Sequence, residues 1–328
     1  LKTLKYLECQ RMDKRFDISI VIPLYNEELI FPELVDRLCN LQKKSNLQFE
    51  FVLIDDGSKD KTPLFMRQLS MENDHFHCVF LSKNYGHQEA ITAGMKYATG
   101  TKAVMLMDGD LQDPPELALN FYDKIQKGYD VVFAVRKKRK EGVIMRFLYW
   151  FYYRIQSWFT EVKMPMDSGD FSMMSRQVVD IINGFPEKTR FLRGLRTWVG
   201  FNQIEFEYER DSRSAGETKY SFKKLMKLGI DGILSFSDVP LKLITKLGFI
   251  TIVISLFYIS FLIYRKLRWN DIPQGYTTLF IGLSLFSGVQ LICLGLIGEY
   301  LSRIYKEVKN RPAFIIRNRI VKKNIVHE

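Results

Sequence analysis

The sequence predicts an α/β protein built on a doubly wound, mostly parallel sheet, followed by amphipathic interfacial helices and a C-terminal hairpin of two transmembrane helices. Three observations predict this fold. Across residues 16–220, short β-branched apolar runs alternate with helical stretches, as in parallel strands joined by crossover helices. Two long apolar runs without charged residues follow, and basic residues dominate after residue 300.

Five apolar runs are the expected strands, and polar or Gly- and Pro-containing residues follow each of them. The runs are Ile18–Ile22, Phe49–Ile54, Cys78–Leu81, Ala103–Met107 and Asp130–Val135. In open α/β sheets, ligands bind outside the carboxyl ends of the parallel strands. We therefore expect the functional residues in the loops that follow these runs.

The composition indicates an anionic partner. The 328 residues include 48 Lys and Arg against 37 Asp and Glu, a net charge of +11. Charge alone fits a nucleic acid, an anionic membrane or a phosphate-bearing substrate. Its concentration after residue 300 favours lipid headgroups, and we expect no nucleic-acid partner. The four cysteines are far apart in the sequence, which predicts neither a disulfide framework nor a zinc site and fits a reducing cytoplasmic face.

The apolar runs Leu247–Tyr264 and Tyr276–Gly298 are the expected membrane spans. A helix that crosses a bilayer needs about 17–25 residues. Either run alone is also compatible with a buried helix of a soluble domain, but two runs followed by a basic segment favour a hairpin. Because the hairpin's flanks hold more positive charge than its short loop, we expect both ends and the preceding α/β domain on the cytoplasmic side of the inner membrane.

The remaining boundaries follow from charge and aromatic content. Residues 1–15 contain no apolar core of signal-peptide length and are expected to form an N-terminal extension. Residues 146–160 are rich in Phe, Tyr and Trp, and residues 221–240 mix lysines with apolar side chains, so both are expected to contact the membrane surface. An aromatic stripe of this kind is also typical of a core. The expected hairpin covers residues 241–302, and residues 303–328 are expected to form a basic cytoplasmic tail.

An acidic turn follows the fourth expected strand. Asp108 and Asp110 flank Gly109, so both carboxylates can point at one hard cation, and Gln112 adds a further oxygen. Mg²⁺ and Mn²⁺ prefer oxygen ligands and keep open positions for phosphate oxygens. A bare acidic turn at a strand end is the alternative. The helix opened by Pro114 and Pro115 favours the metal site.

The first two strands end in residues suited to a nucleoside. Pro23, Tyr25 and Glu27 supply a ring and polar groups after the first strand, and Asp55 and Asp56 follow the second. A carboxylate there can accept from a base or a ribose hydroxyl, although it can also cap a helix or close a turn. No G-x-G-x-x-G or Walker glycine–lysine loop is present, which disfavours a Rossmann dinucleotide site and a P-loop.

These motifs resemble a known family. Residues 22–28, 55–58 and 108–116, Gly169-Asp170-Phe171, and Arg213 with Gly216-Glu217-Thr218-Lys219 are similar to family 2 glycosyltransferases with the GT-A fold, of the polyprenyl-phosphate branch. That branch includes dolichol-phosphate mannose synthases and bacterial bactoprenol glucosyltransferases. The hairpin ending in Gly298-Glu299-Tyr300 resembles the bacterial members in particular. Gly109 departs from the family, which often has Ala there, and we expect this to leave metal binding undisturbed.

The resemblance implies residue roles. The nucleoside would be bound by Pro23, Tyr25, Glu27 and Asp56, with Asp55 as the close alternative. Asp108, Asp110 and Gln112 would hold Mg²⁺ or Mn²⁺ and the diphosphate, and Arg136, Arg213 and Lys219 would meet donor or acceptor phosphates. Asp170 would orient the acceptor or sugar, remove a proton, or act only as a structural turn carboxylate. The segment Asn84–Ala90 would shape the nucleotide pocket without taking part in the chemistry.

The expected function is inverting transfer of a hexose from UDP-glucose or UDP-N-acetylglucosamine to undecaprenyl phosphate, giving a lipid-linked sugar for cell-envelope glycosylation. A processive polysaccharide synthase shares the fold and aspartates, but its downstream Gln-x-x-Arg-Trp element is absent here. Transfer of a sugar phosphate is distinguished by its release of a nucleoside monophosphate. A noncatalytic membrane scaffold that binds nucleotide sugar or lipid is the alternative from another class. Exposed aromatic surface makes a homo-oligomer compatible with the sequence.

Overall fold

The computed structural model describes residues 16–136, 168–188, 190–208, 239–269 and 275–326. The expected N-terminal extension, the aromatic segment 146–160, most of the interfacial segment 221–240, and Arg213 and Lys219 lie outside these residues. The described chain falls into two compact units. One holds the sheet and includes residues 312–326, and the other holds the two long C-terminal helices.

The first unit is built on a nine-stranded sheet with the order β7-β5-β6-β4-β1-β2-β3-β8-β9. Strands β1 to β4 are parallel to one another where they pair. The five expected strands are confirmed, with small shifts at their ends. The strands are β1 (Ile18–Leu24), β2 (Phe49–Asp55), β3 (Phe76–Leu81), β4 (Ala103–Leu106), β5 (Val131–Arg136), β6 (Ser168–Ser175), β7 (Gln203–Tyr208), β8 (Ile316–Val321) and β9 (Asn324–Val326).

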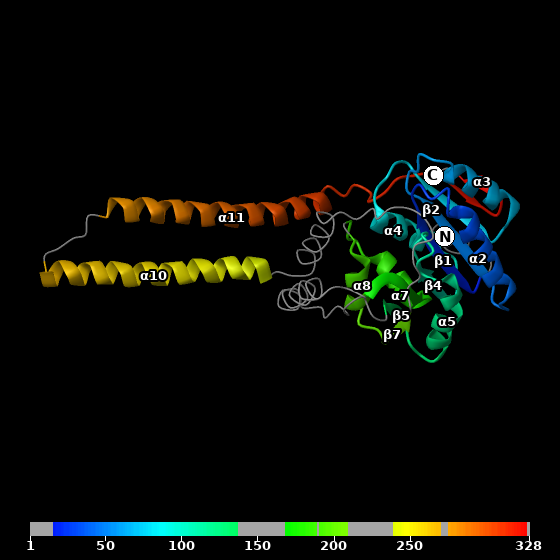
Figure 1. The fold of residues 1–328 in the computed structure, drawn as a ribbon, viewed down its shortest axis with the longest axis horizontal. Coiled ribbons are helices and arrows are strands. Elements are labelled where there is room, and N and C mark those ends of the chain that lie inside the picture. Colours follow the sequence, from blue (N-terminus) through cyan, green and yellow to red (C-terminus); the bar gives the residue numbers. More distant parts are fainter. Residues whose placement is uncertain (1–15, 137–167, 189, 209–238, 270–274, 327–328) are drawn as a thin grey trace, which may run out of the picture. The chain divides into compact units, whose positions relative to one another are not determined.

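Helices cover both faces of this sheet, which explains why β1, β2 and β3 are mostly apolar and are buried along their whole length (Figure 1). Leu34 and Leu38 of α2, Met66 of α3 and Phe121 of α5 pack into one core on one face. Helix α4 lies on the other face. The helices are α2 (Phe31–Lys43), α3 (Thr62–Glu72), α4 (His87–Tyr97), the 3₁₀ turn η1 (Pro115–Leu117), α5 (Ala118–Gln126), α7 (Arg176–Gly184) and α8 (Leu192–Trp198).

A buried polar cluster lies at the end of the sheet where β1 and β2 begin. Glu50 is fully buried and accepts hydrogen bonds from Ser19 Oγ, from Thr99 N at 2.7 Å and from Thr99 Oγ1 at 2.8 Å. His77 Nδ1 lies 2.5 Å from Glu50 Oε1. The cluster satisfies a buried carboxylate away from the loops that carry the expected site, so its role is structural.

The C-terminal segment differs from the sequence prediction. Strand β8 pairs antiparallel with β3, with Cys78 opposite Ile320, and β9 pairs antiparallel with β8. Ile316, Asn318 and Ile320 are buried, whereas Arg319 stacks over the Tyr97 ring with 4.0 Å between the guanidinium carbon and the ring centroid. The expectation of a basic tail is therefore wrong for Ile316–Val326. Arg317 and Arg319 alternate with the buried residues Ile316, Asn318 and Ile320 because the segment is an amphipathic strand.

The second unit contains α10 (Val239–Trp269) and α11 (Tyr276–Val308), which run antiparallel (Figure 1). The window Gly248–Arg265 of α10 has a mean hydropathy of 1.8 and is, among the described residues, the one stretch found long and apolar enough to cross a membrane. Large apolar side chains such as Phe257 and Leu291 are exposed, as expected for surfaces that face lipid. The first expected span agrees with this finding, and the second stays a prediction.

Candidate active site

The acidic turn lies where the sequence predicts it, directly after β4. Leu111 adopts a left-handed conformation with φ of 57°, and Gln112 N donates to Asp110 Oδ1 at 3.2 Å, which folds the turn back on itself. Asp110 is buried and Asp108 is partly exposed. A Cβ on Gly109 would overlap the Leu24 side chain, so the turn packs tightly against the end of β1. This packing explains a glycine between the two aspartates.

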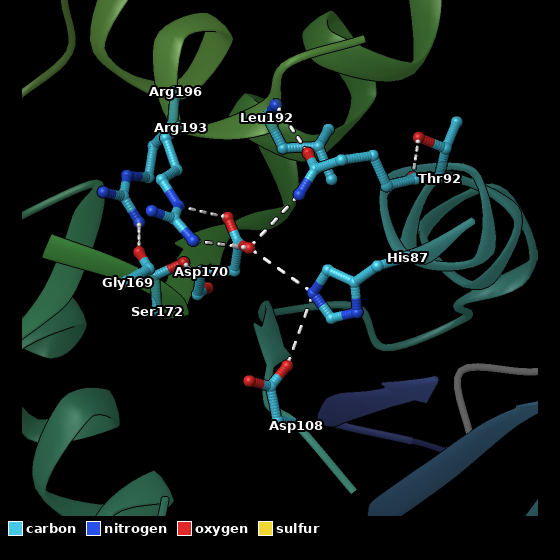
Figure 2. Close-up of polar contacts among 10 residues, drawn as sticks. His87, Thr92, Asp108, Gly169, Asp170, Ser172, Leu192, Arg193 and Arg196 are labelled. Atoms are coloured by element: carbon cyan, nitrogen blue, oxygen red, sulfur yellow. Dashed lines mark hydrogen bonds and ion pairs between the residues drawn. The ribbon is translucent and has the colours of Figure 1, made fainter. Parts of the chain in front are cut away.

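His87, at the first position of α4, faces two carboxylates (Figure 2). Its Nε2 lies 3.4 Å from Asp108 Oδ1 and 3.4 Å from Asp170 Oδ2. We expected the segment Asn84–Ala90 to shape the pocket without entering the chemistry, whereas the structure places His87 between the acidic turn and β6. The contact was missed because it joins residues far apart in the chain.

Asp170, in β6, is held by side chains from two other elements (Figure 2). Arg193 of α8 donates from Nε to Oδ1 at 2.9 Å and from its terminal amino group to Oδ2 at 3.1 Å. Gln88 Nε2 donates to Oδ2 at 3.2 Å, and Gln88 Oε1 accepts from Leu192 N at 3.0 Å. We refer to Asp170, Arg193, Gln88 and His87 as the Asp170 network. It joins α4, β6 and α8, and of its four members the sequence identified only Asp170.

The charges in the network determine its pKa values. Burial alone would raise the pKa of Asp170, but the charge of Arg193 and the hydrogen bonds from His87 and Arg193 outweigh it and hold the pKa well below the usual range. Burial alone would lower the pKa of His87, whereas the hydrogen bond to Asp170 and the charges of Asp108 and Asp170 raise it to about 9. Asp170 is therefore a carboxylate with little basicity, and its pairing with His87 favours the protonated imidazole.

Asp108 lies in a different environment. Loss of hydration raises the pKa of Asp108 to about 6; the nearby His87 opposes the rise and the charges of Asp113, Asp170 and Asp110 add to it. Asp113 itself accepts a short hydrogen bond from the Tyr208 hydroxyl of β7. Carboxylates gathered in this way repel one another, and a cation bound between them relieves that repulsion.

The donor set fits a hard divalent cation. Asp108, Asp110 and Gln112 lie on one tight turn, and their side chains offer only oxygen ligands. In the described part of the chain, no three or more His, Cys, Asp or Glu side chains are grouped so that they could hold a metal ion by themselves. Mg²⁺ and Mn²⁺ are commonly held by one or two carboxylates together with substrate phosphates. When bound, such an ion neutralises charge on a diphosphate. We assign the turn as the position where these residues would hold it.

A pocket of about 430 Å³ opens beside the carboxyl ends of β1, β2 and β3. Tyr25, Asp55 and Ser58 line it, as do Arg67, Lys83 and Arg317. Two predicted nucleoside residues, Tyr25 and Asp55, therefore share one cavity. Arg317 was expected to belong to a basic tail, and the sequence signal that would have identified it is the alternation of β8.

Asp56 takes a different position from its neighbour. Its two carboxylate oxygens accept from Tyr85 N at 2.7 Å and from Gly86 N at 3.0 Å. Gly57 has φ of 72°, and a Cβ there would lie 2.6 Å from Asn84 N. Asp56 and Gly57 thus bind the loop after β3 to the end of β2. Between the two alternatives for the nucleoside contact, Asp55 is the one that lines the pocket.

The structure places the other predicted residues as follows. Pro23 is buried in β1 opposite Ile54. Glu27 N donates to Thr62 Oγ1 at 3.0 Å, which ties the loop after β1 to the start of α3. Arg136 is the last residue of β5. The positions of Arg213 and Lys219 lie outside the described residues, so their roles stay predictions.

Comparison with known proteins identifies the family. Residues 19–182 match the model of glycosyl transferase family 2, and residues 239–304 match the GtrB C-terminal hairpin. The chain is 43% identical over 307 residues to an uncharacterized glycosyltransferase of Bacillus subtilis, covering 93% of this chain and 95% of that protein. It is 36% identical over 301 residues to the SfII prophage-derived bactoprenol glucosyl transferase of Shigella flexneri, covering 92% and 97%.

Among solved structures, glucosyl-3-phosphoglycerate synthase from Mycobacterium tuberculosis, in complex with Mn²⁺, UDP-glucose and phosphoglyceric acid, aligns with a TM-score of 0.46 at 16% identity, covering 67% of this chain and 78% of that one. The family assignment depends instead on the two model matches and on relatives that align along nearly the whole chain. The chain belongs to glycosyl transferase family 2 and is a glycosyltransferase with a GT-A fold and a GtrB C-terminal hairpin.

Proposed function

We propose that this enzyme transfers one hexose, with inversion, from a UDP-sugar to undecaprenyl phosphate at the cytoplasmic face of the membrane, giving a lipid-linked sugar for cell-envelope glycosylation. Relatives that align along nearly the whole chain are bactoprenol glucosyl transferases, which supports a polyprenyl phosphate acceptor and favours UDP-glucose over UDP-N-acetylglucosamine. The metal would be Mg²⁺ or Mn²⁺ at Asp108, Asp110 and Gln112.

The observation that carries the proposal is the state of Asp170. Both of its oxygens accept from Arg193, and its pKa is held well below the usual range. An alcohol acceptor needs a general base to take its proton, and Asp170 is poorly suited to that task. A phosphate monoester is already ionised near neutral pH. The Asp170 network therefore fits an acceptor that arrives as an anion.

The chemistry follows from the charges. An acceptor phosphate oxygen forms a bond to the anomeric carbon of the sugar, and the bond from that carbon to the UDP oxygen breaks, so negative charge develops on the leaving diphosphate. Groups aimed at that charge lower the barrier. His87 Nε2 lies 3.4 Å from Asp108 Oδ1, so a protonated His87 would supply positive charge next to the acidic turn. Arg193 fixes Asp170, which in turn orients His87.

The membrane topology is supported by the sheet. Strand β8 follows α11 and pairs with β3, so the chain returns after the hairpin to the same domain that precedes it. Such a return requires an even number of crossings. This favours two spans, α10 and α11, over the single one that hydropathy identifies among the described residues.

The test is a donor screen with the full-length protein, a short polyprenyl phosphate and Mg²⁺ or Mn²⁺. We expect UDP and a singly glycosylated lipid from UDP-glucose. Release of UMP would instead identify transfer of a sugar phosphate, and a lengthening glycan would identify a processive synthase. No release of nucleoside diphosphate with any UDP- or GDP-sugar would refute the proposal.

A further inference from the structure

The pocket beside β1, β2 and β3 is completed by a residue from the far end of the chain. Arg317, which follows the hairpin in sequence, lines the same cavity as Tyr25 and Asp55. Its terminal amino group donates to Ser82 O at 3.1 Å, and Ser82 N donates to Ile315 O at 2.9 Å. These contacts hold the guanidinium over the end of β3.

Strand direction explains why Arg317 reaches this edge. Strand β8 is antiparallel to β3, with Leu81, the last residue of β3, opposite Ile316, the first residue of β8. The start of β8 therefore lies beside the carboxyl ends of the parallel strands, where ligands of open α/β sheets bind. Arg319 lies farther along the strand and stacks on Tyr97 of α4 instead.

Strand order separates Arg317 from the acidic turn at Asp108 and Asp110. The order β4-β1-β2-β3-β8 places four strand spacings between the strand that ends at Asp108 and the strand that carries Arg317. At about 4.8 Å per spacing, this is roughly 19 Å. A donor whose diphosphate is held at Asp108 and Asp110 would therefore extend its nucleoside, not its phosphates, toward the pocket.

The chemistry of the pocket matches a nucleoside. Arg317 has only hydrogen-bond donors, whereas the Asp55 carboxylate is an acceptor and Tyr25 offers an aromatic ring. A uracil ring presents carbonyl oxygens, an N–H group and a flat face. We propose that Arg317 is a specificity-determining residue that donates to the nucleoside of the sugar donor, so that the segment after the membrane hairpin completes the donor site. This inference rests on the proposed function.

The rest of β8 is anchored independently of Arg317. Arg67 of α3 donates to Asn318 Oδ1 at 3.2 Å and lies over the Phe80 ring at 4.2 Å, and Ile320 is fully buried in the core. Arg317 itself is exposed. Replacing it should therefore remove its donors without detaching the strand.

The experiment measures binding of UDP and of UMP to full-length protein in detergent, with and without Mn²⁺, for wild type, Arg317→Ala, Arg317→Lys and the control Lys323→Ala. Lys323 carries the same charge in the β8–β9 turn and lies 4.0 Å from Asp74, outside the pocket. A charged hydrogen-bond donor lost from a binding site costs about tenfold or more in affinity. We expect Arg317→Ala to weaken UDP and UMP binding about equally, by about tenfold, with or without Mn²⁺. Arg317→Lys should be intermediate and Lys323→Ala unchanged.

Several results would overturn the inference. Binding within twofold of wild type for Arg317→Ala would remove Arg317 from the donor site, and a loss confined to UDP would place it on the diphosphate. A wild type that binds neither nucleotide would also refute it. Because nucleotide binding needs no acceptor and no transfer, a failure of the proposed reaction with normal, Arg317-dependent UDP binding would count against the proposed function alone.

Discussion

Replacing Arg193 with Met tests whether the Asp170 network works as a unit. The change keeps an unbranched apolar side chain but removes two charge-assisted hydrogen bonds, at 2.9 and 3.1 Å, from a carboxylate whose side chain is only 7% exposed. Breaking a buried ion pair costs about 3–5 kcal/mol, and an exposed pair contributes about 0–1 kcal/mol. Because the Arg193 side chain is 32% exposed, we expect about 2 kcal/mol.

That loss should lower the Tm of the full-length protein in detergent by about 4–8 °C. The rate of UDP release at saturating substrates should fall at least about tenfold, since the orientation of Asp170 and His87 is lost. The control is Lys127→Met, which removes a 2.6 Å ion pair to Asp123 between side chains that are both more than half exposed. It should change neither quantity measurably.

A double-mutant cycle separates this reasoning from an independent role for Asp170. Asp170→Asn and Arg193→Met should each reduce the rate, and the double variant should lose much less than the sum of the two free-energy changes. If Asp170 acted alone as a general base, the losses would add. Additive losses, or an Arg193→Met protein with unchanged Tm and rate, would refute the network.

Three further predictions follow from single residues. Asp110→Ala should abolish transfer while the protein still inserts into membranes and keeps its Tm within a few degrees; a near-normal rate would remove Asp110 from the metal site. Glu50→Gln should cost about 3–5 kcal/mol near neutral pH. Burial would raise the pKa of Glu50, but the hydrogen bond and charge of His77 lower it, so this contribution is present above about pH 4.3 and is lost as the pH falls through the folded-state value. The difference in unfolding free energy between the two proteins should therefore be constant from pH 7 down to about 4.3 and shrink as the pH falls further, and a difference that stays constant down to the acid unfolding limit would contradict the assignment. Gly57→Ala, with a Cβ 2.6 Å from the Asn84 backbone and a strained φ, should lose on the order of 1–2 kcal/mol and weaken UDP binding, which thermal unfolding and titration would measure.

The sequence predicted the strands whose burial is uniform. Strands β1 to β5 are short, mostly apolar runs because helices cover both faces, and that pattern is visible without a structure. Strand β6 carries Ser168, Gly169, Asp170 and Ser172, so it lacks an apolar run and only its motif was noticed. In strand β8 the buried Ile316, Asn318 and Ile320 alternate with Arg317 and Arg319, and the expectation of a basic tail was based on the number of positive charges and not on this period of two.

Some residues of the candidate site could be predicted from the sequence, and others could not. Residues that follow predicted strands, such as Tyr25, Asp55 and Asp108, were placed at the correct edge because that edge follows from the parallel arrangement. His87, Arg193 and Arg317 were not assigned to the site, because each depends on which distant segments become neighbours. The residues next to His87 and Asp170 in the sequence do not indicate that these two side chains lie 3.4 Å apart.

The pairing of β8 with β3 also affects the order in which the protein folds. Cys78 and Ile320 are neighbours in the sheet although the whole membrane hairpin lies between them in the chain. During synthesis, the edge of β3 has no partner from β8 until residues beyond the hairpin leave the ribosome. An unpaired edge strand is a site of aggregation, and contacts of such long range form slowly. The sheet can therefore be completed only after the hairpin has been synthesised. A protein truncated before the hairpin would lack β8 and would leave the edge of β3 exposed permanently.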